Sequence, residues 1–197
     1  MRKPLHTLIQ FSDVHVVPEG KLLHGSVDTL ANLEAALTEV EAAAVRPAAL
    51  LFTGDLADAG DAESYRRLRE TVGKAAARIG APALFGMGNH DTREAFHADL
   101  LGNQPSSSAR DFVHEADGLR IIVLDTTEPG HHHGDLTDEQ LAWLRERLAT
   151  PAEHGTILAL HHPPIPSPLE ILEMLTLRQH AELADIVRGS DVRLIVA

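Results

Sequence analysis

The sequence predicts an α/β protein, and two features of the chain support that prediction. Short apolar runs alternate, along all 197 residues, with segments whose apolar residues recur at helical spacing. One pair of apolar runs flanks Asp117-Gly118, a dipeptide typical of the turn between two antiparallel strands. Such alternation with a single hairpin indicates sheets that carry helices on their faces. Because no linker or internal repeat interrupts the pattern, we expect one domain over residues 1–197.

The first half of the chain reads as three strands, each followed by a helix. The helices are indicated by apolar residues three or four positions apart, such as Leu33 and Leu37. Asp61 is the expected N-cap of the second helix, which Gly80 and Pro82 end. The expected strands are 5–11, 48–53 and 83–87, and the expected helices are 27–40, 61–79 and 92–101.

The second half of the chain predicts the hairpin and then two further strands separated by helices. A polar loop over residues 103–110 precedes the hairpin. Thr137 and Gln140 form a capping-box pattern, which predicts that a helix begins there and runs to Leu148. The expected strands are 112–115, 119–124, 156–160 and 192–196, and the expected helices are 137–148 and 180–188.

Composition excludes several classes of partner and site. Asp and Glu total 29 against 17 Lys and Arg, and the formal net charge of -12 disfavours nucleic-acid polymers and anionic membranes. The absence of cysteine excludes disulfides, thiolate metal sites and cysteine nucleophiles. The N-terminus has no signal-peptide pattern, and no apolar run approaches the roughly 20 residues of a membrane span. We therefore expect a cytoplasmic protein.

Polar residues follow four of the predicted strands, at the points where those strands end. Ligands of open α/β sheets bind at the carboxyl ends of the strands, so these residues are candidates for one site. Carboxylate, imidazole and amide oxygen are ligands for Mn, Fe or Zn. Crowded aspartates would have raised pKa values unless a cation offset their charges, which also favours a metal site. The four stretches are Ser12-Asp13-Val14-His15, Gly54-Asp55, Gly88-Asn89-His90-Asp91 and His161-His162-Pro163-Pro164.

These motifs, in this order, resemble those of the calcineurin-like metallophosphoesterase superfamily. Within it the chain is most similar to the class III cyclic-nucleotide phosphodiesterases, and the resemblance runs from about Leu8 to the end of the chain. The resemblance implies a β-sandwich flanked by helices. The stretches that carry it are residues 52–58, 87–91, 118–126, 129–134 and 160–167.

The resemblance also implies a role for each site residue. Asp13 and His15 would bind a first metal ion, Asp55 would bridge two ions, and Asn89 and His161 would bind the second. His90 would face the substrate and either stabilise the phosphate or protonate the leaving oxygen, while Asp91 would orient His90. The residues expected to contact substrate are Asn89, His90, His132 and His162.

By the same resemblance, the function is hydrolysis of 3′,5′-cyclic nucleotides, above all cyclic AMP, by a hydroxide that bridges the two metal ions. The ions would be Fe, Mn, Zn or Co, with Mn and Fe preferred. The substrate would be a small phosphodiester. The oligomeric state stays open, with a homodimer as the candidate because class III relatives are often dimers. Two alternatives stay open. The chain could be a glycerophosphodiester or broad-specificity phosphodiesterase, or a truncated, non-catalytic chain that binds a nucleotide or a partner.

Three further residues or segments have competing interpretations. Asp58 is interpreted as a cap at the approach to the second helix rather than as part of the site. The triplet 131–133 is interpreted as a substrate-facing loop, with a solvated surface loop as the alternative. His162 is interpreted as a wall of the site rather than as a metal ligand.

The end of the chain departs from the family pattern. Residues 192–197 resemble the strand that leads into a Gly-His-x-His motif, and the chain stops where that motif should begin. We therefore expect the second sheet to lack its C-terminal part, and each metal ion to lack one histidine ligand.

Overall fold

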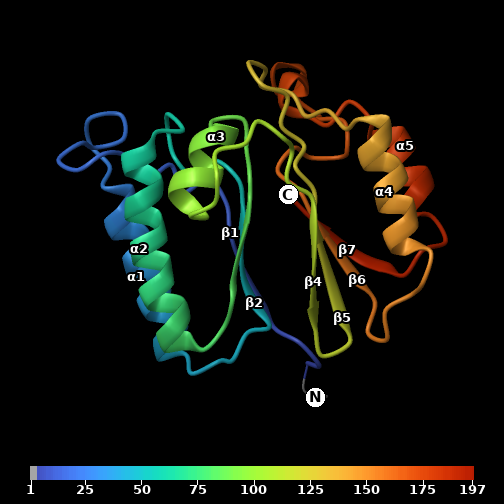
Figure 1. The fold of residues 1–197 in the computed structure, drawn as a ribbon, viewed down its shortest axis with the longest axis horizontal. Coiled ribbons are helices and arrows are strands. Elements are labelled where there is room, and N and C mark those ends of the chain that lie inside the picture. Colours follow the sequence, from blue (N-terminus) through green and yellow to red (C-terminus); the bar gives the residue numbers. More distant parts are fainter. Residues whose placement is uncertain (1–3) are drawn as a thin grey trace. The chain divides into compact units, whose positions relative to one another are not determined.

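A computed structural model describes residues 4–197, and these divide into two units (Figure 1). The first unit comprises the described residues up to Phe85 together with His90–Ser108. The second comprises Gly86–Asn89 and Ala109–Ala197. Each unit contains one sheet with helices, which confirms the mixed α/β fold class. The single domain expected over residues 1–197 stays a prediction.

The sheet of the first unit has three strands in the order β1-β2-β3. These are β1 (Leu8–Phe11), β2 (Ala49–Thr53) and β3 (Ala83–Gly86). β1 runs parallel to β2, with Leu8 opposite Ala49. Every residue of the central strand β2 is buried, which explains why it reads as a continuous apolar run without alternation. β1 begins three residues later than expected, since Leu5 is 79% exposed.

Two long helices and a short helical segment complete the first unit. In Figure 1, α1 (Thr29–Ala42) and α2 (Ala62–Ile79) lie side by side. Asp61 caps α2 as predicted, and Gly80 ends it in the left-handed conformation with φ of 76°. The helix expected over 92–101 is instead a short α-helical stretch, α3 (Arg93–Ala95), that continues as a π-helix, η1 (Phe96–Leu100).

The sheet of the second unit has four strands in the order β4-β5-β6-β7. They are β4 (Phe112–Ala116), β5 (Leu119–Val123), β6 (Thr156–Ala159) and β7 (Val192–Val196). β4 and β5 form the predicted antiparallel hairpin, with Phe112 opposite Val123. Its two turn residues, Asp117 and Gly118, have φ of 49° and 85°, as a tight hairpin turn requires. β5, β6 and β7 pair in parallel.

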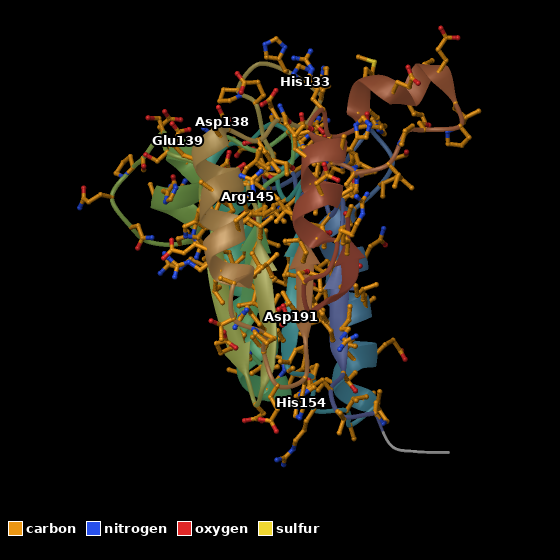
Figure 2. The ribbon with its side chains drawn as sticks, turned by 90° about the vertical axis from the view of Figure 1, so that its right-hand side faces the viewer. His133, Asp138, Glu139, Arg145, His154 and Asp191 are labelled. Atoms are coloured by element: carbon orange, nitrogen blue, oxygen red, sulfur yellow. The ribbon has the colours of Figure 1, made fainter. Side chains whose placement is uncertain are left out.

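The helices of the second unit pack over a leucine-rich core. α4 (Asp138–Leu148) begins with the predicted capping box, and α5 (His180–Val187) follows β6 along the chain. Figure 2 shows Asp138 and Glu139 in the first turn of α4, where negative charge favours the helix, and Arg145 further along. The core residues include Leu144, Leu158 and Leu177, each with no exposed surface. Among the described residues, no helix is both long and apolar enough to cross a membrane.

One helical segment was not expected from the sequence. The 3₁₀ helix η2 (Glu170–Leu175) lies in the connection between β6 and α5. Its apolar residues do not bury a face, since Ile171 is 77% exposed and Met174 is 57% exposed. The sequence does carry a helical pattern here, because Ile171, Met174 and Leu175 lie three and four positions apart, and the prediction left it out.

Candidate metal site

The loops after β1 and β2 hold three candidate ligands in an unusual backbone conformation. Asp13, His15 and Asp55 have φ of 55°, 40° and 50°, in the left-handed region that residues other than glycine rarely adopt. Such residues cost roughly 1–2 kcal/mol each and cluster at functional sites. Hydrogen bonds between the loops hold them, because the N–H of Asp13 donates to the carbonyl of Gly54 and that of His15 to the carbonyl of Asp55.

The side chains of these three residues converge. His15 Nε2 lies 3.5 Å from Asp55 Oδ2 and 3.9 Å from Asp13 Oδ1. One ligand atom from each residue lies within 4.8 Å of the other two, close enough to share one metal ion. Asp55 is buried and Asp13 is exposed, so the group opens to solvent on one side. Two carboxylates and an imidazole fit Mn, Fe or Zn.

Asp58 forms a second group of possible ligands with His15 and His90, and its interpretation as a helix cap is wrong. The cap of α2 is Asp61, whose side chain accepts a hydrogen bond from the N–H of Ser64. Asp58 Oδ1 instead lies 3.3 Å from His15 Nδ1, on the far side of the imidazole from Asp55. In metal sites, a carboxylate in that position orients the histidine ligand. The sequence signal was its place three residues after Asp55, in Gly-Asp-Leu-Ala-Asp.

His90 is anchored to the same loop through its backbone and its ring. Its N–H donates to Asp55 Oδ1 at 2.9 Å, and its Nδ1 donates to the carbonyl of Asp58 at 2.7 Å. The ring meets that of His15 edge to face, with centroids 4.7 Å apart. Because a carbonyl only accepts, the hydrogen lies on Nδ1, and Nε2 is the atom at which His90 gains or loses a proton.

Asp91 secures the loop that carries Asp55. Its carboxylate accepts hydrogen bonds from the N–H groups of Leu56 and Ala57, at 3.1 and 3.2 Å, and from the hydroxyl of Tyr65 at 2.8 Å. Burial and the charge of Asp91 both raise the pKa of Tyr65, so the hydroxyl stays protonated. The role of Asp91 in orienting His90 stays a prediction.

In the second unit, Asn89 lies between two histidines. Its Oδ1 accepts a hydrogen bond from His161 Nε2 at 3.3 Å, and its Nδ2 donates to His132 Nδ1 at 3.3 Å. The structure therefore brings together the amide and imidazole that were predicted to bind the second metal ion. It also places His132 beside them, and substrate contact by His132 stays a prediction.

His162 is buried beneath the histidine loop. It is 1% exposed, and its Nδ1 hydrogen-bonds with the hydroxyl of Thr126 at 2.7 Å. Burial, with a smaller effect of His161, lowers the pKa of His162 to about 3, so the ring is neutral near pH 7. A Cβ on Gly134 would lie 2.5 Å from His162 Cβ, so the loop approaches closely because Gly134 has no side chain. Substrate contact by His162 stays a prediction.

The loop that carries the three consecutive histidines is held in place by backbone hydrogen bonds. The N–H of Gly134 donates to the carbonyl of Thr176, and the N–H of Arg178 donates to the carbonyl of Gly134. The rings of His131 and His133 lie with centroids 4.8 Å apart. Figure 2 shows His133 in this loop, ahead of α4. Desolvation, aided by Arg178 and His131, lowers the pKa of His133.

The structure thus gathers the predicted residues into two groups, one in each unit. Sequence reasoning missed Tyr65 and Thr126, which hold the groups in place. Both read as ordinary residues of a helix or a strand end, because their roles depend on partners 26 and 36 positions away along the chain. No sequence pattern marks such a partner.

Known proteins resemble this chain in sequence and in fold. The sequence profile of the calcineurin-like phosphoesterases matches residues 6–197. The chain is 46% identical to a probable cyclic nucleotide phosphodiesterase from Rhodococcus erythropolis, and 48% identical to a cAMP/cGMP dual specificity phosphodiesterase from Mycobacterium tuberculosis. Both alignments cover 99% of this chain, but only 64% and 61% of those relatives. The chain therefore spans less than two thirds of their length.

The chain is also similar to a second kind of phosphodiesterase and to a phosphatase of known structure. The chain is 30% identical to a probable glycerophosphodiester phosphodiesterase from Arcobacter nitrofigilis, over 91% of this chain and 66% of that relative. Its fold is similar to the crystal structure of a dimetal phosphatase from Danio rerio, with a TM-score of 0.70. That match covers 99% of this chain and 81% of the other at 15% identity, so it establishes a likeness of fold alone.

Proposed function

The chain belongs to the calcineurin-like phosphoesterase family. From this premise we propose that it acts as a phosphodiesterase that depends on two metal ions and hydrolyses 3′,5′-cyclic nucleotides such as cyclic AMP. The observation that carries the proposal is the convergence of Asp13, His15 and Asp55 on strained loops after two parallel strands. The substrate is supported by the names of the two relatives that are 46% and 48% identical.

The proposed metal ligands come from both groups of residues. In this proposal Asp13, His15 and Asp55 would hold one ion, and Asn89 and His161 would hold another. The donor set suits Mn, Fe, Zn or Co, with Mn and Fe preferred. When bound, such ions supply positive charge for the phosphoryl oxygens and lower the pKa of water.

The chain's own residues supply positioning and proton transfer. His90 donates a proton to the departing oxygen through Nε2, because the carbonyl of Asp58 holds its Nδ1. Asp58 also orients His15, and Asp91 holds the loop on which Asp55 stands. Asn89 and His132 contact the phosphate oxygens, and His162 forms a wall beneath them.

A glycerophosphodiester is the second candidate substrate, favoured by the name of the relative that is 30% identical. The formal net charge of -12 favours a small phosphodiester over a nucleic-acid polymer. A homodimer and a cytoplasmic location remain part of the proposal.

Two measurements on the same chain test the function. The first is metal content after dialysis against Mn²⁺, where we expect two ions per chain. The second is hydrolysis of cyclic AMP, compared with glycerophosphoethanolamine. Two bound ions without turnover of either diester would contradict the phosphodiesterase and favour a non-catalytic nucleotide-binding chain.

Two variants separate metal binding from chemistry. We expect Asn89→Ala to lose the second ion, because it removes an oxygen ligand. We expect His90→Ala to keep both ions and to slow hydrolysis about 100-fold, the usual contribution of a general acid. Full metal occupancy in an inactive Asn89→Ala would refute the ligand role of Asn89.

A further inference from the structure

We propose that a pocket in the first unit, beside the metal cluster, receives the nucleoside part of the substrate. The inference rests on the proposed function and names the part of that site that selects the substrate. The pocket has a volume of about 340 Å³, near the lower end of the range for small-molecule pockets. Its lining includes Val17, Lys21, Leu22, Leu23, His24 and Asp58.

The pocket is continuous with the candidate metal cluster through Asp58. That side chain lines the pocket, and its Oδ1 lies 3.3 Å from His15 Nδ1 and 3.9 Å from His90 Nδ1. A phosphodiester bound at a metal ion that Asp13, His15 and Asp55 would hold therefore has a bordering space for the group esterified to it. A substrate-selecting pocket needs this continuity.

Hydrogen bonds hold the loop over residues 17–27, which forms one side of the pocket, in a fixed position. The Arg67 guanidinium donates to the carbonyl of Val17, and the N–H of Glu19 donates to Glu63 Oε1 at 2.9 Å. Leu23 and Val27 exchange backbone hydrogen bonds at 2.8 and 3.0 Å, which closes the tip of the loop. A pocket ordered in advance costs less entropy to fill, as in most small-molecule sites.

The chemistry of the lining favours a nucleoside over a glycerol group. Val17, Leu22 and Leu23 provide apolar walls that suit a flat heterocycle, and Leu22 is 45% exposed at the mouth. Glycerol offers no comparable apolar surface to bury against them. The polar groups Lys21, His24 and Asp58 stand around these walls, where they offer donors and acceptors to the edges of a base.

The backbone of His24 permits a clean test of its side chain. Its φ of 50° lies in the left-handed region, and it precedes Gly25 at φ of 73°. Glycine at position 24 adopts this backbone without strain, so its substitution for His24 removes the imidazole and preserves the course of the loop.

The pocket is tested with two variants that we expect to preserve the fold. Leu22→Ser removes an exposed apolar wall, and His24→Gly removes the imidazole while it relieves the backbone. Leu5→Ser is the matched control, because Leu5 is an exposed leucine of the same unit that does not line the pocket. Values of kcat and KM are measured for cyclic AMP and for methyl 4-nitrophenyl phosphate, a phosphodiester without a nucleoside.

We expect each pocket variant to raise the KM for cyclic AMP about tenfold, as the loss of one good contact in a pocket does. The ratio of kcat/KM for cyclic AMP to that for the nitrophenyl ester should fall to the same extent, while Leu5→Ser leaves it unchanged. An unchanged ratio in both pocket variants overturns the proposal. An equal rise in KM for glycerophosphoethanolamine also overturns it, since the pocket would then hold any alcohol group.

A further measurement distinguishes failure of the nucleoside pocket from failure of the proposed phosphodiesterase activity. If the wild-type chain hydrolyses neither phosphodiester, the binding of adenosine is measured by the broadening of its proton NMR lines. Adenosine binding that Leu22→Ser weakens supports the nucleoside pocket even without turnover. An absence of adenosine binding to the wild-type chain overturns it.

Discussion

The Tyr65 hydroxyl donates a hydrogen bond to Asp91 Oδ1 at 2.8 Å and accepts one from the N–H of Thr92 at 3.1 Å. Tyr65 comes from the first turns of α2 and has no exposed surface. Since Asp91 also accepts the N–H groups of Leu56 and Ala57, one tyrosine joins the loop after β2 to the loop after β3. The helix thereby fixes the backbone on which the candidate ligand Asp55 stands.

Tyr65→Phe should lower the free energy of unfolding by about 2 kcal/mol, because it takes away the hydrogen-bond acceptor of the Thr92 N–H and one of the hydrogen bonds that Asp91 Oδ1 accepts. The ring is kept, so its edge-to-face contact with Phe96 survives. Urea unfolding followed by circular dichroism measures the loss. A change below about 0.5 kcal/mol would mean that water replaces the hydroxyl, as tolerated hydrogen-bond losses do.

Gly60→Ala should damage the same pair of loops by a steric route. A Cβ at Gly60 would lie 2.6 Å from Thr92 Cγ2 and 2.9 Å from the carbonyl oxygen of His90. Gly20→Ala is the matched control, because Gly20 also has positive φ but nothing lies within 4 Å of its Cβ. Both variants incur backbone strain, and we expect Gly60→Ala to lose about 2 kcal/mol more. Equal losses of stability in the two variants would show that the loops after β2 and β3 move apart to make room for the added Cβ at little cost.

The sequence predicted the elements well where a local signal existed. The caps at Asp61 and Thr137 and the Asp117-Gly118 turn were predicted correctly, because each depends on residues within three positions. The π-helix η1 was predicted as an α-helix, since both keep apolar residues such as Phe96 and Leu100 on the buried side. Asp58 was misread because its contact with His15 Nδ1 joins residues 43 positions apart, which no local pattern shows.

Asp61 gives a prediction for the dependence of stability on pH. Burial raises the pKa of its carboxyl, but hydrogen bonds from the hydroxyl and N–H of Ser64 outweigh this and lower it. A lowered pKa in the folded state contributes stability above the unfolded value, and the contribution is lost as pH falls through the folded pKa. The free energy of unfolding of the wild type relative to Asp61→Asn should therefore decline as the pH falls below 3.8, the ordinary pKa of an aspartate.

Urea unfolding at pH 7 and across the acid range measures this decline. Asp61→Ala should lose about 1 kcal/mol at pH 7, because the cap disappears, whereas Asn keeps a capping oxygen. If the free energies of unfolding of wild type and Asp61→Asn differ by the same amount at every pH, the charge of the carboxylate adds nothing to the cap.

Asp58 is the residue on which the geometry of the candidate metal site can be tested without turnover. It faces His15 Nδ1, while His15 Nε2 faces Asp55 and Asp13. Asp58→Asn keeps the shape and removes the charge, so it should weaken Mn²⁺ binding about tenfold, as the loss of a carboxylate partner does in other metal sites. Isothermal titration with Mn²⁺ measures the affinity.

Asp28→Asn is the control for Asp58→Asn, since Asp28 caps α1 and asparagine caps equally well. The two variants carry the same change of charge, so any general effect of charge on cation binding is common to both. A tenfold difference between them therefore reports the contact between Asp58 and His15. Equal affinities would mean that His15 holds its orientation through its own backbone, where its N–H donates to the carbonyl of Asp55 at 2.9 Å.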